Sequence, residues 1–140
     1  MSETPANVSP FYQGWDVYQD LLIKAIAPLS AEQLTLRAAP HLRSIGEILT
    51  HIIAVRVRWF HGLMGEGGED IAPVGEWDRR GQPVRSAAEL VSGLEQSLRF
   101  VQECLSHWTP ADLEYVFQGH MAGRGVCALA SMGDLACHRA

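Results

Sequence analysis

The stretch SIGEILTHIIAVRVRWFHGLMG, residues 44–65, decides the fold class of this 140-residue chain. Ser44 and Glu47 have the spacing of a capping box, in which the serine and glutamate side chains each bind a free backbone amide. Apolar residues then recur at steps of three and four: Ile48, Ile52, Val55, Trp59 and Leu63. The pattern predicts an amphipathic helix with that stripe in the core and with Arg56 and Arg58 off it. Glycines at 65, 67 and 68 predict its end.

Two more amphipathic helices follow from the same kind of pattern. The segment from Ser9 to about Ala27 places four apolar residues on one face: Trp15, Tyr18, Leu22 and Ile26. Ser30 with Gln33, and Ser86 with Glu89, have capping-box spacing and predict helix starts. The stripe after the second of these boxes consists of Leu90, Leu94, Leu98, Val101, Leu105 and Trp108. Its near-heptad spacing is typical of a helix bundle.

The segments around these helices lack such patterns. Residues 66–85 are rich in glycine, proline and charge and predict a long connection without strands. Thr109, Pro110 and Asp112 predict one further helical turn. Residues 119–140 contain four glycines and no apolar stripe of useful length. We therefore expect one all-α domain over residues 1–140, an antiparallel four-helix bundle whose fourth helix is incomplete or aberrant, with 119–140 as an atypical tail.

Composition limits the classes of function. A net charge of −5 and a pI near 5.6 argue against a general nucleic-acid binder. No apolar run approaches the length of a membrane span, and the N-terminus has no signal-peptide pattern. The three cysteines, Cys104, Cys127 and Cys137, form no CxxC pair. These features predict a cytoplasmic protein with neither a nucleic acid nor a membrane as partner.

His51 is the main candidate for a functional side chain. It lies three residues after Ile48 and four before Val55, so it is on or beside the predicted core face. One interpretation is a histidine whose nitrogens are satisfied at the edge of the core. The other is a metal ligand presented into the bundle, which needs at least two further ligands from other helices.

Few partners for His51 are visible in the sequence. His41, His61, His107 and His120 are scattered, and none of the histidines pairs with another at a spacing of four. Asp134 and His138 have that spacing and would share a face if the tail were helical. Cys104 is expected to be a packing residue rather than a nucleophile. Arg79 and Arg80, in the long connection, are expected to be solvated, with contact to an acidic substrate as the alternative.

Residues 9 to about 117 resemble the DinB/YfiT-like superfamily of small bacterial proteins, which is distinct from the DNA polymerase that shares the name. The resemblance is carried by FYQGWDVYQDLLIKAIAPLSAEQL, RSIGEILTHIIAVRVRWFHGLMGEG and SAAELVSGLEQSLRFVQECLSHWTPADLE, in that order. It implies a four-helix bundle, often a homodimer, with a divalent metal of the zinc or nickel type held by three histidines. His51 matches the histidine of the second helix. The resemblance also implies a small-molecule substrate or thiol cofactor and activity as a thiol-dependent transferase or hydrolase.

The other two histidines of the family belong to its last helix, in a pattern close to WHxxEHDxHH, which this sequence lacks. We hypothesise that the tail encodes that helix in a shifted reading frame. Read one base later, Met132 followed by glycine becomes tryptophan, and Cys137 becomes valine or alanine. The shifted codons of MGDLACHRA and a TGA stop permit WVIWHVTEHD. On this hypothesis the chain retains one metal ligand, the metal is absent, and the site is impaired.

Three functional hypotheses follow. The first is a divalent-metal-dependent enzyme of the DinB type, with His51 as a metal ligand and no general base that the sequence identifies. The second is a non-catalytic helical module for binding or dimerisation, which needs only the apolar stripes. The third is a product without activity, for which a version restored to the shifted frame folds better and binds metal.

Overall fold

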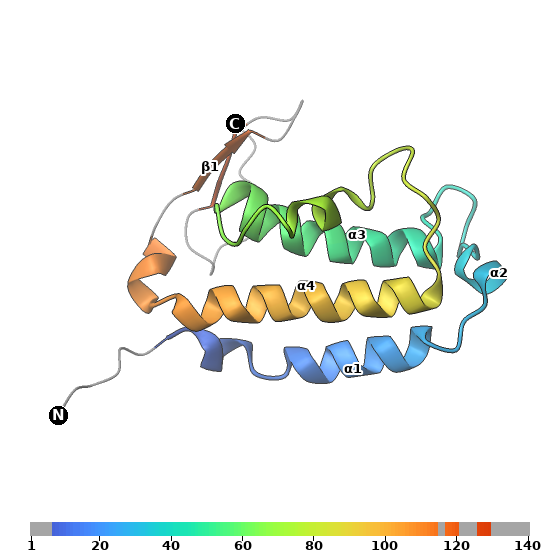
Figure 1. Cartoon of the computed structure of the whole chain (residues 1–140), viewed down its shortest axis with the longest axis horizontal. Helices are drawn as coiled ribbons and strands as arrows, with labels where there is room; N and C mark the ends of the chain where they lie inside the picture. Colours follow the sequence, from blue (N-terminus) through green and yellow to red (C-terminus); the bar gives the residue numbers. More distant parts are fainter. Residues whose placement is uncertain (1–6, 115–116, 121–125, 130–140) are drawn as a thin grey trace.

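The computed structural model describes residues 7–114, 117–120 and 126–129, and its body is a layer of three long helices (Figure 1). These are α1 (Trp15–Ile26), α3 (Ile45–Val57) and α4 (Ala87–His107). Helix α4 lies between the other two and packs against both. The all-α fold is confirmed for this body, so the apolar periodicity of the sequence identified its helices.

Helix directions differ from the simple antiparallel expectation. Helix α1 runs antiparallel to α4, and the buried Val8 before it donates its backbone N–H to Trp108 O at 3.0 Å. Helices α3 and α4 run in the same direction (Figure 1). Accordingly, Phe60 after α3 contacts Phe100 near the end of α4, with ring centroids 6.4 Å apart. The connection between α3 and α4 is long because it must return the chain to the end where α3 began.

The helix starts are those that the capping boxes predict. Ser30, Ser44 and Ser86 each accept a hydrogen bond from the backbone three residues on, and the side chain there binds the serine N–H in return. The first box starts the single turn α2 (Ala31–Leu34). Thr109 likewise binds Asp112 at the start of the 3₁₀ turn η4 (Pro110–Glu114). Local side-chain chemistry therefore sets these boundaries.

The N-terminal helix is shorter than the sequence predicts. A 3₁₀ turn, η1 (Ser9–Tyr12), precedes it, and Gly14 separates the two with a φ of 98°. Left-handed backbone of this kind favours glycine and breaks a continuous helix. On α1 itself Ile26 is buried and Leu22 is partly buried, but Trp15 is 42% and Tyr18 is 75% exposed. The predicted core face of α1 is therefore only half correct.

Helix α3 is rotated relative to the expected core stripe. Its buried apolar residues are Leu49, Ile53, Ala54 and Val57. Ile48 is 47% exposed, and Ile52 and Trp59 are only partly buried. The helix continues as the π-helical segment η2 (Arg58–Leu63), which turns Phe60 into the core. In contrast, every residue of the stripe predicted for α4, including its cap Trp108, is buried.

The remaining described segments are short. The connection after η2 contains one 3₁₀ turn, η3 (Ala72–Glu76), and no strand, as predicted. Strands β1 (Phe117–His120) and β2 (Val126–Leu129) form an antiparallel hairpin in which Phe117 pairs with Leu129. Where the tail is described, its backbone is therefore extended rather than helical. Asp134 and His138 lie outside the described residues. In the described part of the chain, no helix has the length and apolarity needed to cross a membrane.

Candidate functional site

The candidate site is built around His51, which projects from the middle of α3. Its Nδ1 lies 2.7 Å from Asp78 Oδ2, in the connection just after η3. The histidine side chain is 39% exposed, whereas the aspartate side chain is 12% exposed. Because the carboxylate accepts a hydrogen bond from Nδ1, the lone pair of the neutral ring is on Nε2. A carboxylate behind one ring nitrogen is the usual support of a histidine that binds a metal through the other.

Arg58 fixes Asp78 from a second direction. Its Nη2 donates to Asp78 Oδ2 at 2.9 Å, its Nη1 donates to Oδ1, and the same Nη1 donates to Gly75 O at 2.8 Å. The hydrogen bonds from Arg58, followed by the hydrogen bond from His51, lower the pKa of Asp78 to about 2. In turn, Asp78 raises the pKa of Arg58. The carboxylate is therefore charged at neutral pH and available to orient His51.

Trp77 anchors the loop that carries Asp78. Its ring lies over Gly93 of α4, and a Cβ at that position would be 2.5 Å from Trp77 Cζ3. Glycine is therefore required for the indole to approach the helix backbone so closely. Arg85 also packs on Trp77, with its guanidinium carbon 4.2 Å from the centre of the ring. This packing holds the connection between η2 and α4, residues 64–86, against α4. We call this connection the crossover; its packing fixes the position of Asp78 beside α3.

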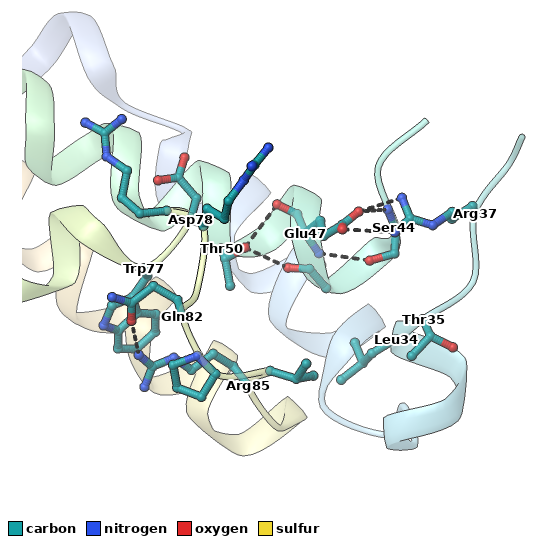
Figure 2. A pocket seen from close by; sticks show the side chains of 15 residues that line it. Leu34, Thr35, Arg37, Ser44, Glu47, Thr50, Trp77, Asp78, Gln82 and Arg85 are labelled. Atoms are coloured by element: carbon teal, nitrogen blue, oxygen red, sulfur yellow. Dashed lines mark hydrogen bonds and ion pairs between the residues drawn. The ribbon is translucent and has the colours of Figure 1, made fainter. Parts of the chain in front are cut away.

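A cleft of about 520 Å³ lies between this loop and the start of α3. Figure 2 shows Trp77, Gln82 and Arg85 grouped on one side, and Arg37, Ser44 and Glu47 on the other. Asp78 lines the cleft and also holds His51, so the cleft and the histidine share a wall. A second, smaller cleft adjoins it and includes His41 and Arg43.

The other residues singled out from the sequence do not join His51. His61 Nδ1 lies 2.8 Å from Glu66 O, so it has a local structural partner. His41 and His107 are exposed, and His120 lies in β1. Burial raises the pKa of the Cys104 thiol to about 11, which keeps it protonated, as a packing residue should be. Within residues 7–114, 117–120 and 126–129, no group of three or more potential ligands could hold a metal ion.

The described residues therefore supply only part of a metal site. They supply one ligand atom, His51 Nε2, and the carboxylate that orients the ring. A catalytic site of the zinc type takes about three protein ligands, so this part of the chain alone does not form one.

Sequence reasoning missed Asp78 and Arg58. Arg58 lies seven residues after His51, two helical turns further on the same side of the helix, so helical spacing could have found it. Asp78 lies 27 residues from His51, and only the path of the crossover brings it there. No local pattern in the sequence marks that contact.

The helical body and the histidine site together define a small helical-bundle protein. The sequence model of the DinB superfamily matches residues 15–136, which is most of the chain. The chain therefore belongs to the DinB superfamily, as the resemblance of its helices predicted. No curated protein and no solved structure shows a significant match to it.

Proposed function

We propose that this chain derives from a divalent-metal-dependent enzyme of the DinB type, with His51 Nε2 as one metal ligand. The observation that supports the proposal is the contact of His51 Nδ1 with Asp78 at 2.7 Å, in which Asp78 is itself held by Arg58. A carboxylate hydrogen-bonded to one ring nitrogen is the partner that commonly orients a metal-ligating histidine. This geometry leaves Nε2 available to coordinate.

In the proposed enzyme, each residue of the site has a separate role. His51 binds the metal, Asp78 holds the imidazole in one tautomer and orientation, and Arg58 keeps Asp78 charged. If a divalent metal of the zinc or nickel type were held there by His51 and ligands from outside the described residues, it would supply Lewis acidity that lowers the pKa of a bound water or thiol. This chemistry suits a hydrolase or a thiol-dependent transferase acting on a small molecule. We propose that the protein works as a cytoplasmic homodimer.

Metal stoichiometry tests the proposal. The chain restored to the shifted reading frame of its tail is loaded with nickel or zinc, desalted and analysed for bound metal, alongside its variants His51→Ala and His107→Ala. We expect His51→Ala to lose the bound metal and His107→Ala, an exposed histidine at the end of α4, to retain it. Asp78→Asn should weaken the affinity about 10- to 100-fold without removing a ligand. Equal metal content in His51→Ala and the restored chain would exclude His51 as a ligand.

We also propose that the missing ligands are encoded in the shifted frame of the tail. The support is the forced tryptophan at the codon of Met132 and the permitted histidine and glutamate positions that follow. The test is a fresh nucleotide read from codon 110 to beyond the stop. A shifted frame that continues as WHxxEHDxHH supports the hypothesis, and a frame interrupted by stops overturns it. The chain restored to that frame should bind metal under conditions where the present chain does not.

Exposed apolar side chains favour one alternative, a non-catalytic binding or dimerisation module. Trp15, Tyr18 and Leu21 of α1 are exposed and follow one another at steps of three residues, so they lie on one side of the helix. Such a cluster is typical of a surface that another element covers. Light scattering of Tyr18→Ser tests this idea, because loss of a dimer with unchanged helicity would assign the face to self-association. Stoichiometric metal bound through His51 would instead favour the enzyme.

A further inference from the structure

Positive charge is concentrated in the two adjoining clefts beside His51. They share Arg37, Glu47, Thr50 and Asp78 in their walls. Of the 11 lysines and arginines in the chain, five line these clefts: Arg37, Arg43, Arg79, Arg80 and Arg85. The whole chain carries a net charge of −5, so this surface is locally opposite in sign to the protein. A cleft lined by one sign of charge concentrates ligands of the other sign.

The two acidic residues in the clefts are already engaged. Glu47 accepts from Arg37 Nη1 at 2.7 Å and from Nη2 at 2.9 Å, and it also accepts from the backbone N–H of Ser44. Asp78 is held by Arg58, which does not line either cleft. The negative charge of Asp78 is therefore balanced by a residue outside the clefts. Of the other arginines in the clefts, Arg79 donates from Nε to Glu76 Oε2 at 3.2 Å, so the surplus positive charge lies with Arg43, Arg80 and Arg85.

Arg80 and Arg85 carry most of that surplus. Arg80 is exposed and makes no hydrogen bond or ion pair with any described residue. Arg85 stacks on Trp77 and donates from Nη2 to Gln82 Oε1 at 3.3 Å, as Figure 2 shows. Its Nε is buried without a hydrogen-bond partner in the described part of the chain, and its Nη1 is 3.8 Å from Glu89. Nε is closed to solvent, so an anion in the cleft would meet the terminal Nη groups of this side chain.

We propose that this cleft binds a small organic anion bearing a carboxylate or phosphate group. Arg85 is held by its stacking on Trp77, and an arginine fixed in this way offers two parallel N–H groups to such an anion. Arg80 adds the second positive charge. Leu34, Pro83 and Val84 line the same cleft and provide apolar contact for the body of the ligand. The volume of about 520 Å³ is within the range of small-molecule sites.

The position of the cleft links the anion to His51. Asp78 belongs to both, so an anion bound by Arg80 and Arg85 lies beside the histidine site. That this anion is the substrate of a metal centre rests on the proposed function. The binding of the anion does not rest on it, because none of the arginines is a metal ligand.

Calorimetric titration of the full chain tests the proposal. Succinate and inorganic phosphate are titrated separately at low ionic strength, after the protein has been passed over a chelating resin so that no metal contributes. The variants are Arg80→Gln and Arg85→Gln, with Arg99→Gln as a control that removes the same charge from an exposed position on α4. We expect saturable binding of at least one probe, weakened about tenfold or more by each cleft variant and less than twofold by the control.

Two outcomes would overturn the proposal. Either neither probe binds saturably to the parent chain, or Arg99→Gln and Arg80→Gln weaken binding equally. Arg80 is exposed, so we expect Arg80→Gln to fold normally. If Arg85→Gln fails to fold, the binding measured with Arg80→Gln still tests the proposal. The two probes show whether the site prefers carboxylate or phosphate. His51→Ala should bind the anion as the parent does, which separates failure of this site from failure of the metal site.

Discussion

Arg56 and Arg58 lie two residues apart on one helix and have opposite electrostatic surroundings. Arg58 faces the crossover and meets the carboxylate of Asp78, which raises the pKa of Arg58. Arg56 faces α1 and α4, and its Nη1 donates to Gln19 Oε1 at 3.0 Å, Ser97 Oγ at 3.2 Å and Leu94 O at 3.3 Å. These acceptors are neutral, and burial lowers the pKa of Arg56.

The comparison shows on which side of α3 the buried charges have counterions. On the side of the crossover, a charge pair and a histidine satisfy one another. On the side of α1, a cation meets only neutral oxygens, and Gln19 Nε2 is buried without a partner among the described residues. A buried charge without a counterion destabilises the fold, so its removal is tolerated. A buried ion pair behaves differently, because removal of one partner leaves the other charge uncompensated and lowers the stability strongly. Substitutions on the two sides should therefore have different effects.

The largest effect is expected for Asp78→Asn. This substitution leaves Arg58 partly buried without its counterion and weakens the anchoring of the crossover. We expect a loss of about 2–3 kcal/mol in the free energy of unfolding, below the figure for fully buried pairs because Arg58 is partly exposed. Urea denaturation with an unchanged m-value measures it. A loss below about 0.5 kcal/mol would show that the pair does not stabilise the crossover.

The pH dependence of stability should follow the same pair. Asp78 has a folded-state pKa of about 2, below its ordinary value of 3.8, so its charged form stabilises the fold. This contribution is complete above about pH 4 and is lost as the pH falls towards 2. Its size is on the order of 2 kcal/mol. Denaturation curves collected between pH 5 and 2 should show this loss in the parent chain and a smaller one in Asp78→Asn. Identical pH profiles would contradict the assignment.

Arg56→Met should be much milder than Arg58→Met. Methionine fills the space of the Arg56 stem and removes a charge that has only neutral acceptors. We expect a change within about 1 kcal/mol in either direction, against a loss of about 2 kcal/mol for Arg58→Met. Thermal and chemical denaturation of the two variants in parallel give the comparison. Equal losses would mean that Arg56 is as well compensated as Arg58.

The smallest effect is expected for Gln19→Leu. The substitution removes one acceptor of Arg56 and also removes the buried Nε2 that lacks a partner. These two consequences oppose each other, so we expect a net change of about 0.5 kcal/mol or less. A double-mutant cycle with Arg56→Met measures the coupling directly. A coupling above about 1.5 kcal/mol would show that the Arg56–Gln19 bond is a major part of the interface.

The sequence predicted those features of the fold that local chemistry determines. Ser44 and Glu47 find each other across three residues, so the start of α3 could be read from the chain. The side of α3 that faces the core could not. Ile48 and Leu49, like Ile52 and Ile53, are adjacent apolar residues, and the spacing fits a core stripe through either member of each pair. Packing against α4 chose Leu49 and Ile53, and Ile48 remained exposed.

The candidate site also contains residues that could be predicted from the sequence and residues that could not. His51 was found because it stands out on an apolar helix, but Asp78 reaches it only through the path of the crossover. The arginines of the cleft come from segments before α3 and before α4, so their convergence depends on tertiary structure. The capping boxes fix where helices begin, but they carry no information about which loop passes beside which helix.

The hydrogen bond from Val8 N–H to Trp108 O has a consequence for the order of folding. It closes a loop that contains nearly all of the described chain, and closing a long loop is entropically costly and slow. Helices α3 and α4, with the crossover between them, are nearer in sequence and can assemble first. Helix α1 then docks last on α4. We therefore expect the native contacts of the N-terminal segment to form after those between α3 and α4 and to open more readily.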